Sequence, residues 1–323
     1  MSNFWKDLQK PFFILAPMDD VTDVVFRAVL EKTKRPDVFY TEFTNVEALQ
    51  SKGRSKQIRR FEFTKSQRPI VAQIWGINPQ NYYKTAEEIV KLGFDGIDIN
   101  MGCPEKGVCK SGSCAGLINN HPLAKEIIDA TRKGAGTLPI SVKTRIGFEK
   151  IDTEDWIGFL LDQNLDALII HGRTKKEMSK VPAHWDEIKK AVALRDQRGV
   201  KTLIIGNGDV KNYEDGIKRV KETGVDGIMI GIGVFKDLWC FEKEEDKPKP
   251  TIDEMFNLLL YHANLFVKTW GSEKPFVILR RFFKIYVSNF ENASELRTKL
   301  VLTNSIKEVE GLIKEFKNNQ RVD

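Results

Sequence analysis

The side chain best suited to chemistry in this sequence is Cys103, in the segment Asn-Met-Gly-Cys-Pro. Gly102 permits close approach of the backbone, and Pro104 stiffens the loop that follows. A cysteine with an ordinary pKa of about 8.5 is mainly protonated at neutral pH, so it can donate a proton as well as attack an electrophile. Burial as an inert core residue is the alternative, because unpaired cysteines often pack as small apolar side chains.

A metal site is a second use that the cysteines suggest. Cys103, Cys109 and Cys114 are close in sequence, but their spacing lacks the close pair that is usual in zinc sites. An iron–sulfur cluster would need a fourth cysteine nearby, and Cys240 lies in another part of the chain. We therefore expect no metal.

Other polar residues come directly after apolar runs. Lys143 offers a fixed cation that could stabilise negative charge on a bound cofactor, although a lysine in such a place can also extend into solvent. His171 could hydrogen-bond a cofactor or cap the end of its strand. Residues 206–209 and 231–233 are rich in glycine and precede helical patterns, so their backbone N–H groups could bind phosphate; tight turns are the alternative.

The apolar runs alternate with helical patterns, which is typical of a parallel sheet. We place the strand centres near Ile14, Val38, Ile70, Ile97, Ile140, Leu168, Leu203 and Gly227. Eight βα units in about 240 residues predict an α/β fold, the TIM (β/α)8 barrel, with the reactive residues at the carboxyl ends of the strands. An open Rossmann-like sheet is the structural alternative.

A charged segment with several prolines interrupts this pattern and predicts a domain boundary. We expect a barrel domain over residues 1–241, a linker over 242–251 and a small all-helical domain over 252–323. In the last part, apolar residues at helical spacing predict helices over 252–270, 276–290 and 293–316.

Composition excludes several classes of protein. Of the 323 residues, 41% are hydrophobic and 30% are charged, which excludes extended disorder. The apolar runs are too short to span a bilayer, and we expect no membrane association. Four cysteines without a Cys-x-x-Cys pair suit a reducing compartment, so we expect a cytoplasmic protein. We also expect a monomer without a stable protein partner.

With these segments in view, the sequence resembles the bacterial-type tRNA-dihydrouridine synthases, a family of flavoenzymes, over nearly the whole chain. The motifs that carry the resemblance are Ala-Pro-Met at 16–18, Val-Ala-Gln at 71–73, Asn-Met-Gly-Cys-Pro at 100–104, Val-Lys-Thr-Arg at 142–145, His-Gly-Arg-Thr at 171–174 and Gly-Asn-Gly-Asp at 206–209. Residues 279–297 resemble the helical tRNA-binding domain of that family.

The resemblance implies reduction of specific uridines in tRNA to 5,6-dihydrouridine, with FMN as cofactor and NADPH or NADH as reductant. The reduced flavin would deliver hydride to C6, and Cys103, which matches the proton donor of the family, would protonate C5. The residues implied to bind the flavin are Pro17, Met18, Asp19, Gln73, Lys143, His171, Asn207, Gly208, Asp209, Gly231, Ile232 and Gly233. By position, Asn100 and Arg145 could polarise the uracil carbonyls, and Arg173 is a further candidate for substrate contact.

Three positions depart from the family pattern. Ile232 stands where arginine is usual, Cys114 where glycine is common, and Ser179 where an aromatic residue is frequent. The phosphate would then be held by backbone amides or by another base such as Lys236.

Two groups of basic residues favour RNA as the partner, since each can contact phosphates; a solvated surface is the alternative. The first comprises Lys52, Arg54, Lys56, Arg59, Arg60, Lys65 and Arg68, and the second comprises Arg280, Arg281 and Lys284. Two other functions remain open. One is a dihydroorotate-dehydrogenase-like flavoprotein that acts on a free pyrimidine, and the other is a catalytically inactive RNA-binding barrel.

Overall fold

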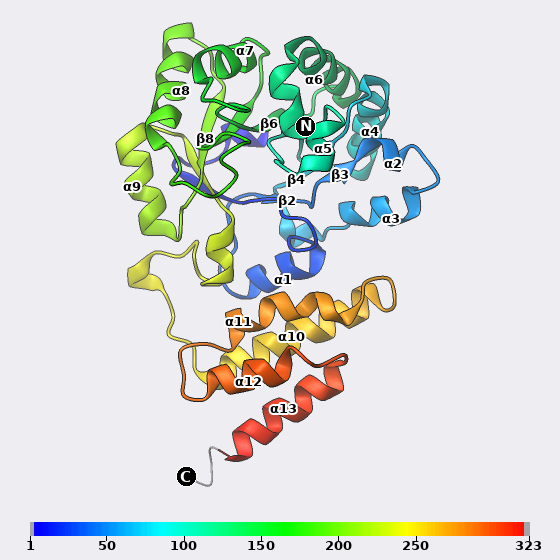
Figure 1. Cartoon of the computed structure of the whole chain (residues 1–323), viewed down its shortest axis with the longest axis vertical. Helices are drawn as coiled ribbons and strands as arrows, with labels where there is room; N and C mark the ends of the chain where they lie inside the picture. Colours follow the sequence, from blue (N-terminus) through cyan, green and yellow to red (C-terminus); the bar gives the residue numbers. More distant parts are fainter. Residues whose placement is uncertain (1–2, 320–323) are drawn as a thin grey trace. The chain divides into compact units, whose positions relative to one another are not determined.

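Parallel strands form a closed barrel in this computed structural model, which describes residues 3–319 (Figure 1). The order in the sheet is β1-β9-β8-β7-β6-β5-β4-β2, and β3 also pairs with β4. A bridge between Ile14 and Val38 closes the ring. The strands are β1 (Phe12–Leu15), β2 (Phe39–Tyr40), β3 (Thr44–Asn45), β4 (Ile70–Trp75), β5 (Gly96–Met101), β6 (Ile140–Arg145), β7 (Ala167–His171), β8 (Leu203–Asn207) and β9 (Gly227–Ile230). The predicted TIM barrel is confirmed.

The predicted strand centres agree with these strands. Seven of them lie inside a strand, and Val38 is the bridging residue directly before β2. The reason is the apolar character of each run, because parallel strands covered on both faces need apolar residues at nearly every position. Ile97 and Ile99 of β5, for example, are fully buried.

The helices of the barrel begin and end at recognisable signals. In α4 the Asn78 side chain accepts a hydrogen bond from the N–H of Gln80, Pro79 occupies the first turn, and Gly93 ends the helix with a φ of 79°. The helices of this part are α2 (Val46–Leu49), α3 (Arg54–Ile58), α4 (Pro79–Leu92), α5 (Lys106–Lys110), α6 (His121–Ala135), α7 (Gly158–Leu161), α8 (Trp185–Arg198) and α9 (Tyr213–Thr223).

The amino-terminal half of the barrel interior, which we call the floor, is apolar. A buried cluster there includes Ile14 of β1, Ile169 of β7, Ile205 of β8 and Met229 of β9. Trp5 of the short helix η1 (Phe4–Lys6) packs against the same cluster. The opposite half, towards the carboxyl ends of the strands, is the mouth.

The chain divides into two compact units, one of residues 3–24 and 36–232 and the other of residues 25–35 and 233–319. The second unit therefore includes most of α1 (Val24–Lys32). Phe26 of α1 stacks on Phe282 with ring centroids 5.1 Å apart, and the Thr33 hydroxyl donates to the Leu238 carbonyl. The remaining helices of this unit are α10 (Ile252–Trp270), η8 (Phe276–Phe282), α11 (Phe283–Tyr286), α12 (Ala293–Leu300) and α13 (Ile306–Asn319).

One helix predicted for this unit is interrupted. Residues 293–316 form α12 and α13 with a turn between them. The Glu308 side chain accepts from the N–H of Asn304 at 2.8 Å, and the Ser305 hydroxyl accepts from the N–H of Glu308, so these residues cap a new helix. Residues 276–290 likewise form a 3₁₀ helix followed by the single α-helical turn of α11.

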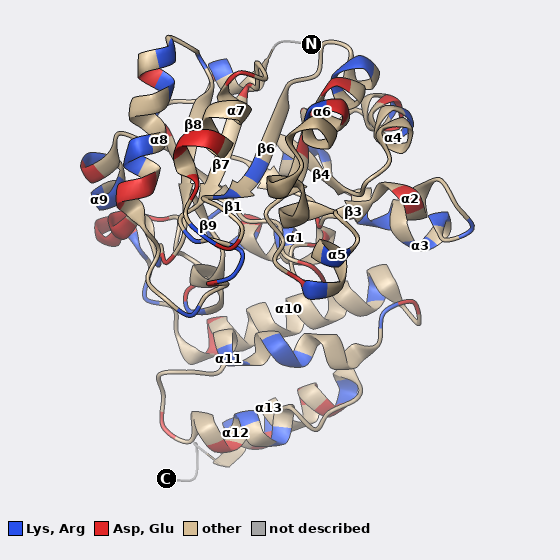
Figure 2. Ribbon diagram, turned by 45° about the horizontal axis from the view of Figure 1, so that its top comes forward, with Lys and Arg blue, Asp and Glu red and all other residues tan. Residues whose placement is uncertain are grey.

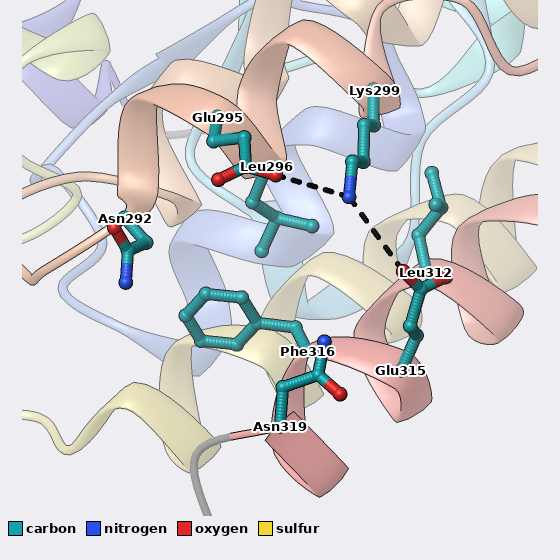
Figure 3. A pocket seen from close by; sticks show the side chains of 8 residues that line it. All are labelled: Asn292, Glu295, Leu296, Lys299, Leu312, Glu315, Phe316 and Asn319. Atoms are coloured by element: carbon teal, nitrogen blue, oxygen red, sulfur yellow. Dashed lines mark ion pairs between the residues drawn. The ribbon is translucent and has the colours of Figure 1, made fainter. Parts of the chain in front are cut away.

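Helices α12 and α13 are joined by an ion-pair network (Figure 3). Lys299 of α12 lies 3.1 Å from Glu295 and 3.6 Å from Glu315 of α13. These groups line a cavity of about 110 Å³ together with Leu296 and Phe316. Among the helices of residues 3–319, none is long and apolar enough to cross a membrane.

Candidate active site

Cys103 follows β5 at the carboxyl end of the barrel, and its side chain is half-buried. The turn that carries it is held by Asn100, whose Oδ1 accepts from the N–H groups of Gly102 and Cys103 at 3.0 and 2.9 Å. A Cβ atom on Gly102 would lie 3.3 Å from backbone atoms of Thr144. Glycine is therefore needed for the turn to approach β6 so closely.

The surroundings of Cys103 favour its thiolate. A hydrogen bond from the Cys114 thiol, together with backbone donors at Glu105 and the charge of Arg145, lowers the pKa of Cys103 to about 6, against the opposing effect of burial. Burial instead raises the pKa of Cys109, whose thiol donates to the Cys103 carbonyl at 3.3 Å, and it raises that of Cys114 further. Cys103 is thus mainly ionised at neutral pH, contrary to the ordinary value assumed from the sequence.

The three cysteines do not form a metal site by this geometry. Within residues 3–319, no three His, Cys, Asp or Glu side chains are grouped so that they could hold a metal ion.

A cluster of cationic and imidazole side chains faces the mouth. Arg145, His171 and Asn207 are neighbours in register across β6, β7 and β8, and Lys143 lies two residues before Arg145. Burial, together with the charge of Arg145, lowers the pKa of Lys143 to about 8. Burial and three neighbouring cations lower the pKa of His171 well below its ordinary value, so the ring is neutral at pH 7. The mouth therefore concentrates positive charge and favours an anionic ligand.

The guanidinium of Arg145 is bound to backbone carbonyls. Its Nε donates to the Gly102 carbonyl at 2.8 Å, and its Nη1 donates to those of Thr174 and Met178, each at 3.0 Å. Arg145 thereby ties the turn of Cys103 to the loop after β7.

Arg173 is likewise buried and fully engaged. Its Nη2 donates to both carboxylate oxygens of Asp209 at 2.6 Å, and its Nη1 lies 3.1 Å from His171 Nε2. Its Nε donates a further hydrogen bond to the Val181 carbonyl. Arg173 joins the loops that follow β7 and β8.

Lys143 is placed differently from the two arginines. Its Nζ donates to Asn207 Oδ1 at 3.2 Å, while the Asn207 amide nitrogen donates to the Met229 carbonyl. Within the described part of the chain, no carboxylate lies within ion-pairing distance of Lys143. A half-buried ammonium with an amide neighbour suits an anionic partner supplied by a ligand.

The first and last loops of the barrel also reach the mouth. Pro17 is buried and Met18 half-buried directly after β1, whereas the Asp19 carboxylate forms an ion pair with Arg60. After β9, Gly231 is half-buried, Ile232 is 70% exposed, and Gly233 is the next residue of the chain. Gly208 has a φ of 128°, and a Cβ atom there would lie 2.7 Å from that of Ala183, so this turn also requires glycine.

The basic residues singled out from the sequence differ in burial and in their contacts within the protein. In the first group, Arg54 pairs with Glu88 and Arg68 with Asp95, from other parts of the chain. In the second unit, Arg280 donates to the carbonyl of Thr303 at 3.0 Å and is half-buried. Arg281 and Lys284 are exposed on η8 and α11, and Figure 2 shows basic residues on α3 and α11.

Sequence reasoning missed Asp98, a fully buried acid of β5 that accepts hydrogen bonds from Gln73 and Ser141. Burial raises the pKa of Asp98 to about 6. The signal was present in the sequence, because Gly-Ile-Asp-Ile-Asn places an acid inside an apolar strand.

Comparison with known proteins gives consistent results. The family description "Dihydrouridine synthase (Dus)" matches residues 14–321. A probable tRNA-dihydrouridine synthase of Staphylococcus aureus (strain MRSA252) is 47% identical over 317 residues, which are 97% of this chain and 95% of that protein. A probable tRNA-dihydrouridine synthase 2 of Bacillus subtilis (strain 168) is 46% identical over 318 residues, 97% of this chain and 96% of that protein.

Solved structures share the fold at low sequence identity. Morphinone reductase has a TM-score of 0.50 and 12% identity, over 73% of this chain and 86% of that one. A variant of NCR from Zymomonas mobilis has a TM-score of 0.50 and 17% identity, over 74% of this chain and 89% of that one.

Proposed function

Because the chain belongs to the dihydrouridine synthase family, we propose that it reduces specific uridines of tRNA to 5,6-dihydrouridine. We assign FMN as its redox cofactor and NADPH or NADH as its reductant. The observation that carries this proposal is the position of the Cys103 thiol at the carboxyl end of the barrel, on a turn tied to Arg145 of the cationic cluster. A thiol beside cationic groups supports the proposal, because a protonated thiol can act as an acid and the cations suit an anionic ring.

The side chains at the mouth have the chemistry that FMN requires. The ammonium of Lys143 suits the negative charge of the reduced ring. The amides of Gln73 and Asn207 are hydrogen-bonded within the protein, so each would bind the ring by exchanging one of those partners. Backbone N–H groups of the turns at 206–209 and 231–233 suit the phosphate, which offsets the lack of a side-chain cation at Ile232. The residues that we propose to hold FMN are Pro17, Met18, Asp19, Gln73, Lys143, His171, Asn207, Gly208, Asp209, Gly231, Ile232 and Gly233.

The residues of the mouth would hold FMN, which in its reduced form would supply the hydride for C6 of the uracil ring. Cys103 in its protonated form supplies the proton, and its Sγ–H bond breaks as the new C5–H bond forms. The thiolate that remains is stabilised by the hydrogen bond from Cys114 and by the charge of Arg145. Arg145 also keeps the Gly102–Cys103 turn in place through the Gly102 carbonyl. This chain therefore contributes the acid, its position and the electrostatic stabilisation of its conjugate base.

The target uridine must leave the stacked RNA to reach this depth. We propose that the helical part of residues 252–323 contacts tRNA phosphates, with Arg281 and Lys284 as the exposed cations. Charge reversal of both should raise the Kd for tRNA and flatten its salt dependence. Lys221→Glu, at an exposed position of α9, is the matched control. Equal salt slopes for all three proteins would contradict this assignment.

The reaction is tested with purified protein, FMN, NADPH and tRNA transcribed without modifications. We expect a uridine nucleoside to gain two hydrogen atoms, measured by mass spectrometry of the digested tRNA. Free dihydroorotate should not be oxidised by the same protein. A protein that binds and reduces FMN but leaves tRNA unchanged would contradict the proposed function.

A further inference from the structure

A chain of hydrogen-bonded polar side chains begins at Asp98, deep inside the barrel. The Asp98 carboxylate accepts hydrogen bonds from Gln73 Nε2 at 2.7 Å and from Ser141 Oγ at 2.6 Å. All three side chains are fully buried. Gln73 Oε1 in turn accepts from Asn100 Nδ2 at 2.9 Å.

The same chain ends at the turn that bears the thiol. Asn100 Oδ1 accepts from the backbone N–H groups of Gly102 and Cys103, at 3.0 and 2.9 Å. Two side-chain amides thus connect a buried carboxylate to the backbone of Cys103.

The two ends of this chain fix the orientation of both amides. An ionised carboxylate can only accept, so the amide nitrogen of Gln73 must face Asp98. Backbone N–H groups can only donate, so the amide oxygen of Asn100 must face Gly102 and Cys103. A flip of either amide would oppose donor to donor or acceptor to acceptor in a buried place, where a lost hydrogen bond is costly.

The burial of the Asp98 carboxylate needs an explanation, because apolar side chains fill the floor below it. Removing a carboxylate from water is unfavourable unless it gains specific partners. Asp98 gains two, and one of them, Gln73, leads directly to the reactive turn. The other, Ser141, has its hydroxyl 3.4 Å from that of Tyr40.

We propose that Asp98 is a positioning residue: through Gln73 and Asn100 it holds the Gly102–Cys103 turn, and with that turn the thiol, in place. The inference rests on the proposed function, because it concerns the thiol that we assign as the acid. It deepens that function by adding a residue that never touches the uracil ring.

The test measures the pH midpoint of Cys103 alkylation by iodoacetamide, followed by mass spectrometry of the full-length, cofactor-free protein. In Asp98→Ala the turn should relax, and the thiol should leave the surroundings that favour its ionised form. The midpoint should therefore rise from about 6 in the parent towards the ordinary value of about 8.5. If this variant does not fold, Gln73→Met breaks the same chain in its middle and should give the same rise.

Three variants separate positioning from other roles. Asp98→Asn keeps a carbonyl oxygen for Gln73 and can donate to Ser141, so its midpoint should stay near that of the parent. Ser141→Ala, the matched control, removes the other hydrogen bond of Asp98 and should also leave the midpoint in place. In an Asn100→Ala background, where the chain is already broken, Asp98→Ala should cause no further rise.

The inference is overturned if folded Asp98→Ala keeps the parental midpoint, or if Asp98→Asn shifts it as far as alanine does, since the charge alone would then matter. Alkylation requires neither FMN nor tRNA. If the alkylation midpoints of the parent and the variants are as expected but the parent forms no dihydrouridine, the proposed function is contradicted and the positioning role of Asp98 still stands.

Discussion

The floor and the mouth of the barrel are built from the same strands but are filled by opposite kinds of side chain. On β7, Ile169 belongs to the apolar cluster of the floor, while His171, two residues later, lies among the cations of the mouth. The floor stabilises the fold by burying apolar surface, and the mouth opposes folding by bringing like charges together. The difference shows that stability and reactivity are separated along each strand, within one barrel interior.

The largest effect should follow from removing the acid of the mouth. Cys103→Ala should keep the fold, the flavin and its reduction by NADPH, because the thiol takes no part in those steps. Reoxidation of the reduced flavin by tRNA should slow by roughly 10²- to 10⁴-fold, as is typical for loss of a general acid. Single-turnover absorbance measurements check this, with Cys109→Ala as the matched control. Equal slowing in both variants would assign the effect to the loop instead of the thiol.

A substitution in the floor should act on stability alone. Ile169→Ala removes a fully buried side chain and leaves a cavity, so the free energy of unfolding should fall by about 2–5 kcal/mol. Urea denaturation measures this loss. The pH midpoint of Cys103 alkylation should not move, and a shift in that midpoint would show that floor and mouth are coupled.

Removal of the unpaired cation of the mouth should weaken the proposed cofactor site. Lys143→Met keeps the length of the side chain but leaves the charge of the reduced flavin without a partner. We expect about tenfold weaker FMN binding or slower flavin reduction, measured by fluorescence titration and stopped-flow absorbance. Lys175→Met, in the loop after β7, is the control. Unchanged values for Lys143→Met would remove this residue from the cofactor site.

The smallest effect should appear as a shift in pH dependence. Cys103 donates its proton only when protonated, and its pKa of about 6 predicts that reoxidation by tRNA slows as the pH rises above 6. In Cys114→Ala the loss of the hydrogen bond raises the Cys103 pKa. The decline should then begin at higher pH, and the rate at pH 8 should exceed that of the parent. A profile identical to that of the parent would show that Cys114 does not tune the acid.

The barrel could be predicted because each strand carries its own signal. Runs such as Ile97 to Asn100 combine apolar side chains with a polar ending, and the ending marks the mouth. The interruption between α12 and α13 was also readable, since Ser305 and Glu308 have the spacing of a capping box. Apolar residues keep their helical spacing across that turn, so the sequence pattern predicted one continuous helix.

The partners of the site residues could not be predicted, because they depend on loops that meet only in the fold. Arg145 and Arg173 were assigned to substrate by position, yet both are engaged by carbonyls or by Asp209 within the protein. The lowered pKa of Cys103 depends mainly on Cys114, which follows later in the chain. Sequence spacing locates a reactive residue more readily than it reveals what that residue touches.

Because most of α1 belongs to the second unit, the two units do not correspond to two continuous fragments of the chain. The backbone passes from the first unit to the second near residue 25, returns near 36 and leaves again near 233, so the two units are interlaced by three covalent passages. A fragment that begins at Gly233 would lack Phe26 and the aromatic stack that it forms with Phe282. A single proteolytic cut between 232 and 233 would sever residues 233–319 from α1, and only noncovalent contacts such as the Phe26–Phe282 stack would then hold them together. The helical unit is therefore not a detachable module, and exchanging it between relatives would require exchanging α1 with it.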